Sequence, residues 1–263
     1  MENINWETVE LTIENNIANI VMNRPQALNA LDNQITNDLT NAFERCLQDD
    51  VRVITLTGRG KAFSSGGDIK LMTQLDSKPK ALGELLENLH KLIIKIRNMD
   101  KPVIASINGF AFGAGFSLAL ACDFRIAAKN STYSCAFVNI GLVPDSGASF
   151  FLTKLLGVAK ATELMMLGDT YNSEQIWAMG LLNRLVNDDE LNIVTKNYAL
   201  SLADKPARSI SMIKRMVNKA IISDLPDQLS LEAMLQLEAV KTPDFREGIT
   251  AFVEKRSAKF NQK

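Results

Sequence analysis

Apolar and polar residues alternate near the start of the chain, and a second apolar run follows closely. The stretch Val9–Ile13 has the period of two that a half-buried strand shows, and Ile17–Met22 is the next apolar run. Asn15 and Asn16 lie between the two runs, and asparagine is favoured in tight turns. This pattern predicts an N-terminal β-hairpin.

Longer apolar repeats then alternate with short β-branched runs. Apolar spacings of three and four residues predict helices, and β-branched runs bounded by turn residues predict strands. The predicted order is helix 31–46, strand 51–56, helix 82–96, strand 102–107, helix 113–121 and strand 124–127. Such alternation is typical of an α/β fold, in which layers of helix cover a sheet.

From about Thr195 onward the pattern is helical throughout. Ser223–Pro226 is the clearest break in this region. Thr242 and Pro243 predict the start of a new helix, because Thr caps a helix and Pro fits its first position. We therefore expect a core at residues 1–195 and a C-terminal helical region at residues 196–263.

Composition narrows the class of protein. The 263 residues are 46% hydrophobic and 22% charged with a net charge of −1, which gives no electrostatic footprint for nucleic acid or an anionic membrane. Three cysteines without a CxxC pair favour a reducing compartment, and a single histidine disfavours a histidine-based zinc site. Met1–Glu10 lacks the apolar segment of a signal peptide. We expect a cytoplasmic protein with neither a membrane span nor a nucleic-acid partner.

A glycine pair follows the predicted strand at 51–56. In the segment Lys61–Lys70, Gly66 and Gly67 allow backbone N–H groups to approach a ligand closely. Asp68 is placed to cap a helix that begins at Ile69. Taken alone, the segment is better explained as an ordinary turn between a strand and a helix.

A second segment rich in small residues, Asn108–Phe116, joins a strand to an apolar helix. Its glycines, taken alone, are explained by close helix packing. Neither segment has the spacing of a nucleotide-binding loop. Two such turns, each with free N–H groups at a helix start, can together form an oxyanion hole. An oxyanion hole suits a thioester enolate, whose oxygen gains negative charge when the α-carbon loses a proton.

Four motifs in order resemble those of the enoyl-CoA hydratase/isomerase (crotonase) family, and the resemblance spans nearly the whole chain. The motifs are Asn23–Leu31, Ser65–Ile69, Asn108–Gly115 and Phe245–Arg256. The resemblance implies a crotonase-type spiral of ββα units over residues 1–195, followed by a helical region that forms homotrimers or dimers of trimers. It also implies an acyl-CoA substrate and no separate cofactor, since coenzyme A enters as part of the thioester.

By the same resemblance, the oxyanion donors are the backbone N–H groups of Gly67 and Ala114. The residues implied in binding coenzyme A are Gln26, Ala27, Leu28, Lys70, Phe252 and Lys255. In the family the last two often reach the ligand of a neighbouring subunit. Without the resemblance, Phe252 is explained as a core residue and Lys255 as part of a solvated face.

The chain departs from the pattern of the family's hydratases, which use two glutamates. Ser117 and Phe137 stand at the matching positions, where we expect them to line the substrate pocket. Neither carries a charge at neutral pH, so neither can act as the usual general acid or base. Asp145 follows Pro144 in a predicted turn and resembles the acid of family members that shift double bonds or open rings. The alternative is that Asp145 is only a turn residue, since Pro-Asp-x-Gly is ordinary turn chemistry.

His90 lies on the flank of the amphipathic helix 82–96. Some dehalogenases of the family use a histidine on this helix, but we predict a partly exposed structural residue here.

The leading hypothesis is therefore an acyl-CoA isomerase that works through an enolate, closest in look to the ring-epoxide isomerase of phenylacetate breakdown. The alternatives are a hydratase with displaced catalytic groups and a weakly catalytic relative that binds acyl-CoA or RNA.

Overall fold

The computed structural model of the chain describes residues 1–73 and 79–260. Within them, two sheets form, with the strand orders β1-β2-β3-β4-β6-β8-β11 and β10-β9-β7-β5. The large sheet contains β1 Glu2–Asn5, β2 Val9–Glu14, β3 Ile17–Met22, β4 Val53–Gly58, β6 Val103–Ile107, β8 Phe124–Ala128 and β11 Arg184–Val186. The small sheet contains β5 Ala62–Ser64, β7 Phe110–Phe112, β9 Thr132–Ser134 and β10 Thr170–Asn172. The α/β class predicted from the sequence is confirmed.

The predicted hairpin is present at the edge of the large sheet. β2 and β3 pair antiparallel, with Val9 opposite Met22 and Glu14 opposite Ile17. Asn15 and Asn16, at the turn, have φ values of 52° and 61°. Asparagine tolerates this left-handed region better than most residues, so the turn chemistry fits the sequence. From β3 the sheet continues with parallel neighbours β4, β6, β8 and β11.

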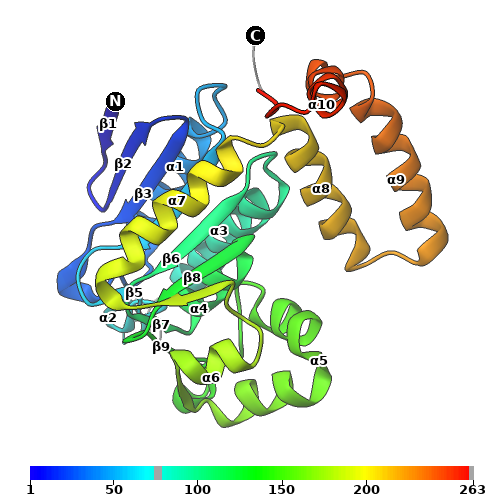
Figure 1. Cartoon of the computed structure of the whole chain (residues 1–263). Helices are drawn as coiled ribbons and strands as arrows, with labels where there is room; N and C mark the ends of the chain where they lie inside the picture. Colours follow the sequence, from blue (N-terminus) through cyan, green and yellow to red (C-terminus); the bar gives the residue numbers. More distant parts are fainter. Residues whose placement is uncertain (74–78, 261–263) are drawn as a thin grey trace.

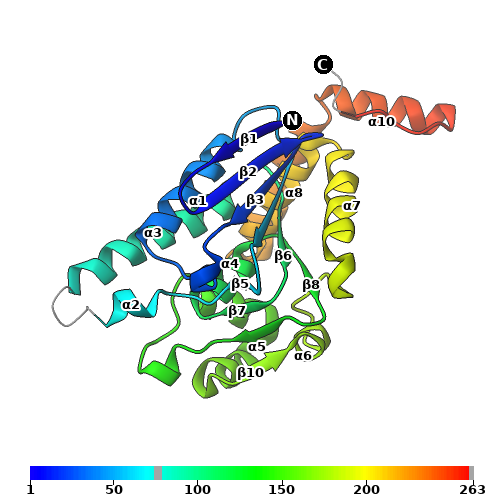
Figure 2. The ribbon, with the colours of Figure 1, turned by 90° about the vertical axis from the view of Figure 1, so that its left-hand side faces the viewer.

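Helices cover both faces of the large sheet (Figures 1 and 2). Helices α1 Asn33–Arg45 and α3 Pro79–Asn98 pack together on one face, and α7 Leu191–Ala203 lies over β4, β6 and β8 on the other. A large apolar core fills the first side, and a smaller one under α7 includes Val53, Ile104, Ile126, Leu191 and Ala199. β4 and β6 are buried on both faces, as is typical of parallel strands that helices cover on two sides.

The part of the fold that surrounds the candidate site lies below the large sheet in Figure 1. Helix α4 Ala114–Ala121 is buried along its whole length and packs on α5 Ala148–Leu167. The remaining short elements here are α2 Ile69–Met72, α6 Ser173–Ala178 and the 3-10 turns η1 Pro25–Ala27, η2 Val138–Ile140 and η3 Asp188–Glu190. A helix that is apolar all round, such as α4, belongs in a core.

The C-terminal region is helical, as predicted: α8 Ala207–Ala220, α9 Leu225–Ala239 and α10 Pro243–Glu254. Asp224 caps α9 within the predicted break, and the Thr242 hydroxyl accepts a hydrogen bond from Phe245 N at 3.1 Å. Helix α8 packs against the core, whereas α9 and α10 extend away from it (Figures 1 and 2). The expected division at residue 195 falls inside α7, whose Thr195 hydroxyl lies 2.9 Å from that of Ser106 on β6.

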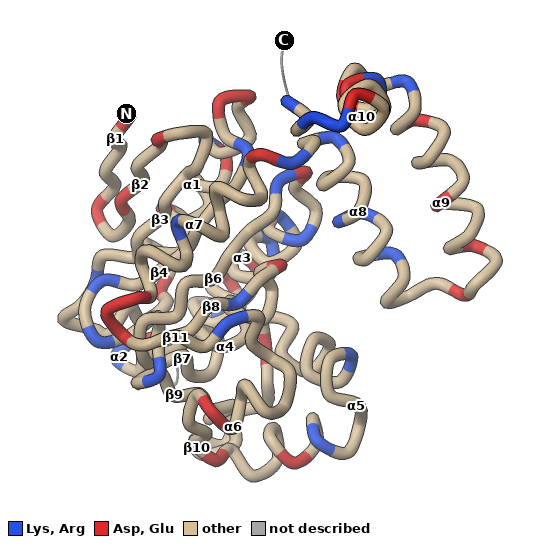
Figure 3. Tube along the Cα trace, viewed as in Figure 1, with Lys and Arg blue, Asp and Glu red and all other residues tan. Residues whose placement is uncertain are grey.

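Among the described residues, no helix combines the length and the apolar composition that crossing a membrane requires. Figure 3 shows acidic and basic residues on both the core and the C-terminal helices. This distribution agrees with the near-zero net charge of the sequence.

Candidate active site

The first glycine turn leaves one backbone amide free. Leu31 N donates to Gly66 O at 2.7 Å, and Asp68 N donates to Leu31 O at 3.0 Å. Gly67 N, between these two bonds, has no acceptor among the described residues. Asp68 Oδ1 accepts from Lys70 N at 2.8 Å, so the predicted cap on the helix at Ile69 is confirmed.

The second glycine turn presents the start of α4. Gly113 has a φ of 50° and stands at the N-cap, where its N–H donates to Ser134 O at 2.9 Å. Ala114 is the first residue of the helix, and an amide at this position has no intrahelical acceptor. Its N–H therefore remains available, in a site where Ala114 is 3% exposed.

The two turns lie directly against each other. Gly66 has a φ of 93°, and a Cβ added there would lie 2.7 Å from Phe112 O and 3.3 Å from Ala114 N. A Cβ on Gly115 would lie 2.4 Å from Ser64 O, so glycine is required for α4 to rest on β5. This contact brings the amide of Ala114 beside the turn that contains Gly67. Two free amides at adjoining turns are the arrangement that an oxyanion hole needs.

Asp145 belongs to the loop between η2 and α5, beside the start of α4. Its backbone oxygen accepts hydrogen bonds from Ala148 N at 3.0 Å and from the Ser117 hydroxyl at 3.0 Å. Its side-chain Oδ1 is buried and has no hydrogen-bond partner among the described residues, and neither has the Ser146 hydroxyl. A buried carboxyl oxygen without a partner is uncommon in a structural turn.

Asp145 is partly buried, and its surroundings change the pKa of its carboxyl. Burial raises the pKa of its carboxyl above the ordinary value, while the charge of His90 opposes that rise. His90 lies on α3 and is exposed, as predicted. Its proximity to Asp145 gave no signal in the sequence, because the two residues come from separate elements. A raised pKa brings a carboxyl closer to the working range of general acid–base catalysis.

Ser117 and Phe137 both lie beside the second glycine turn, at Gly113. Ser117 is fully buried, and its hydroxyl also lies 3.3 Å from Gly113 O. Phe137 is 7% exposed, and its ring edge would lie 3.8 Å from a Cβ on Gly113. The phenyl ring therefore covers the second glycine turn.

Comparison with known proteins agrees with this geometry. The family model for enoyl-CoA hydratase/isomerase matches residues 12–263. The chain belongs to this family. A Rhodobacter capsulatus protein named "Probable enoyl-CoA hydratase" is 35% identical to it over 98% of this chain and 99% of that protein. The Escherichia coli 1,2-epoxyphenylacetyl-CoA isomerase is 34% identical over 95% of this chain and 97% of that enzyme.

Solved structures give the same result for the fold. A crystal structure described as enoyl-CoA hydratase subunit I from Geobacillus kaustophilus superimposes with a TM-score of 0.92 at 33% identity, covering 98% of this chain and 99% of that chain. The expected crotonase-type fold is therefore confirmed. The relatives are named both as hydratases and as isomerases, so the names alone leave the reaction open.

The N-terminal family motif is built onto the first glycine turn. Arg24 forms ion pairs with Asp32 at 3.0 Å and with Asp68 at 2.7 Å. Asn29 is fully buried, and its amide donates to Ala62 O at 2.8 Å. The sequence alone gave no role for Arg24 and Asn29, whose bonds connect the motif to the segment of the first glycine turn.

The residues implied in binding coenzyme A fall into two separate groups. Leu28 has a φ of 51°, in the left-handed region, and its backbone oxygen accepts a hydrogen bond from Ser65 N at 3.0 Å. This bond places Gln26, Ala27 and Leu28 beside the first glycine turn. Lys70, on α2, is exposed next to that turn. Phe252 and Lys255 are exposed at the end of α10, at the far side of the molecule from α2 (Figures 1 and 2). One chain therefore does not bring the two groups together.

Proposed function

We propose that this protein is an acyl-CoA isomerase that works through a thioester enolate. The N–H groups of Gly67 and Ala114 donate hydrogen bonds to the thioester carbonyl oxygen, which acidifies the α-carbon. Asp145 removes a proton and returns it elsewhere on the acyl chain, so a double bond moves or a strained ring rearranges. No separate cofactor takes part in this reaction.

One observation carries the proposal: the carboxyl of Asp145, with a raised pKa and an unpartnered oxygen, lies beside the helix that supplies Ala114. Ser117 and Phe137, by contrast, occupy positions where hydratases of the family carry glutamates. With no carboxylate at either position, the usual water-activating pair is missing. An isomerisation needs one group that moves a proton, whereas a hydration needs a bound water as well.

The acyl group that we propose is apolar or aromatic, because Phe137 covers the oxyanion turn. Within the family, the ring-epoxide isomerase of phenylacetate breakdown is the branch that we favour. The similarity to the Escherichia coli 1,2-epoxyphenylacetyl-CoA isomerase supports this choice. The hydratases among the relatives do not exclude it, since both kinds of name occur at similar identity.

Coenzyme A is proposed to lie along Gln26–Leu28 and Lys70 of one subunit, with Phe252 and Lys255 supplied by a neighbour. Within one chain, α10 lies far from α2 and Phe252 is 83% exposed. A homotrimer or a dimer of trimers supplies that neighbour. The exposed apolar residues of the C-terminal helices support such an assembly.

A second function, hydration with displaced groups, has one observation in its favour. Asp145 Oδ1 and the Ser146 hydroxyl are both buried without partners, and a water bound between them would satisfy both. In that case Asp145 alone would activate the water.

The deciding experiment incubates the enzyme in heavy water with 3-hexenoyl-CoA, crotonyl-CoA and 1,2-epoxyphenylacetyl-CoA. Mass spectrometry then shows which ester gains deuterium and which gains water. Isomerisation with deuterium uptake by the first or third ester supports the proposal. Rapid addition of water to crotonyl-CoA with no isomerisation supports the hydratase instead.

A further inference from the structure

A single buried hydroxyl connects the two halves of the candidate active site. The Ser117 oxygen lies 3.0 Å from Asp145 O and 3.3 Å from Gly113 O, and the residue is fully buried. A serine hydroxyl has one proton to donate, so the two carbonyls share it and the shorter bond goes to Asp145.

The two carbonyls belong to different elements with different tasks. Gly113 is the N-cap of α4, directly before the proposed oxyanion donor Ala114. Asp145 lies in the loop before α5. The hydrogen bond from Ser117 therefore joins the helix that polarises the thioester to the loop that holds the proton-transfer group.

Few other hydrogen bonds hold the Asp145 carboxylate in its place beside α4. The other hydrogen bond to Asp145 O comes from Ala148, which lies in the same segment. Ser146 and Gly147 both have positive φ values, 49° and 86°, and the side-chain Oδ1 of Asp145 has no partner among the described residues. A non-glycine residue in the left-handed region persists only where its surroundings hold it there.

We propose that Ser117 is a positioning residue, which holds the Asp145 loop against α4 so that the carboxylate reaches the α-carbon of a thioester bound at Ala114. This inference rests on the proposed function and adds a role at the position where family hydratases carry a glutamate. In this role Ser117 acts through its hydrogen bond to Asp145 O and does not itself move a proton. Displacement of a catalytic group by about 1 Å can lower a rate roughly 100-fold, so one such bond can matter.

The first test compares Ser117→Ala with Ser173→Ala, using 3-hexenoyl-CoA and 1,2-epoxyphenylacetyl-CoA as substrates. Ser173, on α6, is also a buried serine, and its hydroxyl donates to Lys129 O at 2.7 Å. It therefore controls for the loss of a buried hydrogen bond. We expect kcat to fall about 10- to 100-fold in Ser117→Ala, with KM within about twofold of wild type. A Ser117→Ala enzyme with the same kcat as Ser173→Ala would overturn the proposal.

The second test is a double-mutant cycle with Asp145→Asn. If Ser117 acts through Asp145, then adding Ser117→Ala to Asp145→Asn slows the enzyme no further. A further loss of the same size as in wild type would mean that Ser117 acts independently of Asp145, and the proposal would be wrong. The cycle also separates the proposed isomerase function from the positioning role of Ser117. An Asp145→Asn enzyme with normal turnover refutes the proposed function, whereas an inactive Asp145→Asn with a normal Ser117→Ala refutes only this inference.

Discussion

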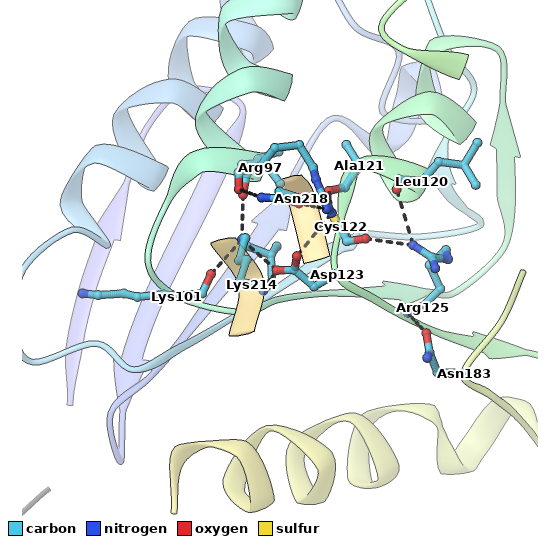
Figure 4. Close-up of polar contacts among 12 residues, drawn as sticks. Arg97, Lys101, Leu120, Ala121, Cys122, Asp123, Arg125, Asn183, Lys214 and Asn218 are labelled. Carbon is cyan, nitrogen blue, oxygen red and sulfur yellow. Dashed lines mark hydrogen bonds and ion pairs between the residues drawn. The ribbon is translucent and has the colours of Figure 1, made fainter. Parts of the chain in front are cut away.

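Lys214 Nζ lies 2.7 Å from Asp123 Oδ2, and this ion pair joins α8 to the residue that precedes β8 (Figure 4). Both side chains are largely buried. The ammonium group also donates to Ile96 O at 2.8 Å and to Lys101 O at 2.9 Å, so all three of its protons have acceptors. Asp123 in turn is paired with Arg97 at 3.2 Å. The cluster holds the first C-terminal helix against the core.

Replacing Lys214 with Met should destabilise the fold. Burial lowers the pKa of Lys214 while Asp123 opposes that shift, as expected for a charge held in place by its partner. Removing one partner of a buried pair costs about 3–5 kcal/mol, and the low end applies here because Asp123 keeps Arg97. Urea unfolding followed by circular dichroism measures the loss. Lys219→Met, an exposed lysine on the same helix, is the control, and equal midpoints for both variants would contradict the prediction.

Replacing Asp145 with Asn should remove most of the activity. Asparagine keeps the shape of the side chain but cannot accept the proton, so kcat on the true substrate should fall roughly 10²–10⁴-fold. Binding of the acyl-CoA should change little, because the oxyanion amides and the proposed coenzyme A contacts remain. Asp169→Asn, at an exposed aspartate, serves as the control. Near-normal turnover in Asp145→Asn would show that Asp145 is only a turn residue.

The pH dependence of kcat/KM should reflect the titration of the buried Asp145 carboxyl. Asp145 acts as a base only when deprotonated, and burial raises its pKa, so activity should be lost on acidification at a higher pH than for an ordinary aspartate. Any residual activity of Asp145→Asn should lack this acid limb, because that variant no longer carries the titrating carboxyl. Ser149→Ala, at an exposed serine of α5, should leave the profile unchanged. A residual activity of Asp145→Asn that keeps the acid limb of the wild type would rule out this account.

Local patterns predicted the main elements of the first half of the fold and the helical C-terminal region. The asparagine turn, the caps at Asp68 and Thr242 and the break before α9 all depend on neighbours within a few residues, so the sequence carried their signals directly. The order of the longer strands and helices up to about residue 127 likewise followed from periodicity. The strands of the small sheet, α5, α6 and β11 were not predicted.

The contacts that join distant elements could not be predicted in the same way. Ser117 and Asp145 are brought together by the packing of α4 on α5, and the charge of His90 reaches Asp145 only because α3 lies close to that loop. Nothing in the spacing of these residues encodes the direction of their side chains. The family resemblance implied roles for Gly67, Ala114 and Asp145, but the hydrogen bond from Ser117 to Asp145 O is visible only in the folded structure.

The C-terminal helices should assemble the protein into trimers or hexamers. Leu235 on α9 is buried within the chain, but Leu237 on α9 and Phe252 on α10 are 65% and 83% exposed. Exposed apolar residues of this size usually mark an interface. We expect light scattering at micromolar concentration to give three or six times the mass of one chain. Leu237→Glu should weaken the assembly more than Gln236→Glu, an exposed neighbour, and a monomeric wild type would contradict the prediction.

The wild-type enzyme should hydrate crotonyl-CoA very poorly, and the double variant Ser117→Glu with Phe137→Glu should gain only weakly. Both positions are buried, so a glutamate there either costs several kcal/mol as a charge or stays protonated. Ser117→Glu also breaks the hydrogen bond to Asp145 O, which we expect to lower any isomerase activity. Loss of the conjugated enoyl absorbance measures hydration directly. A wild-type kcat of about 1–10³ per second would show that the protein is a hydratase, with catalytic groups other than those proposed.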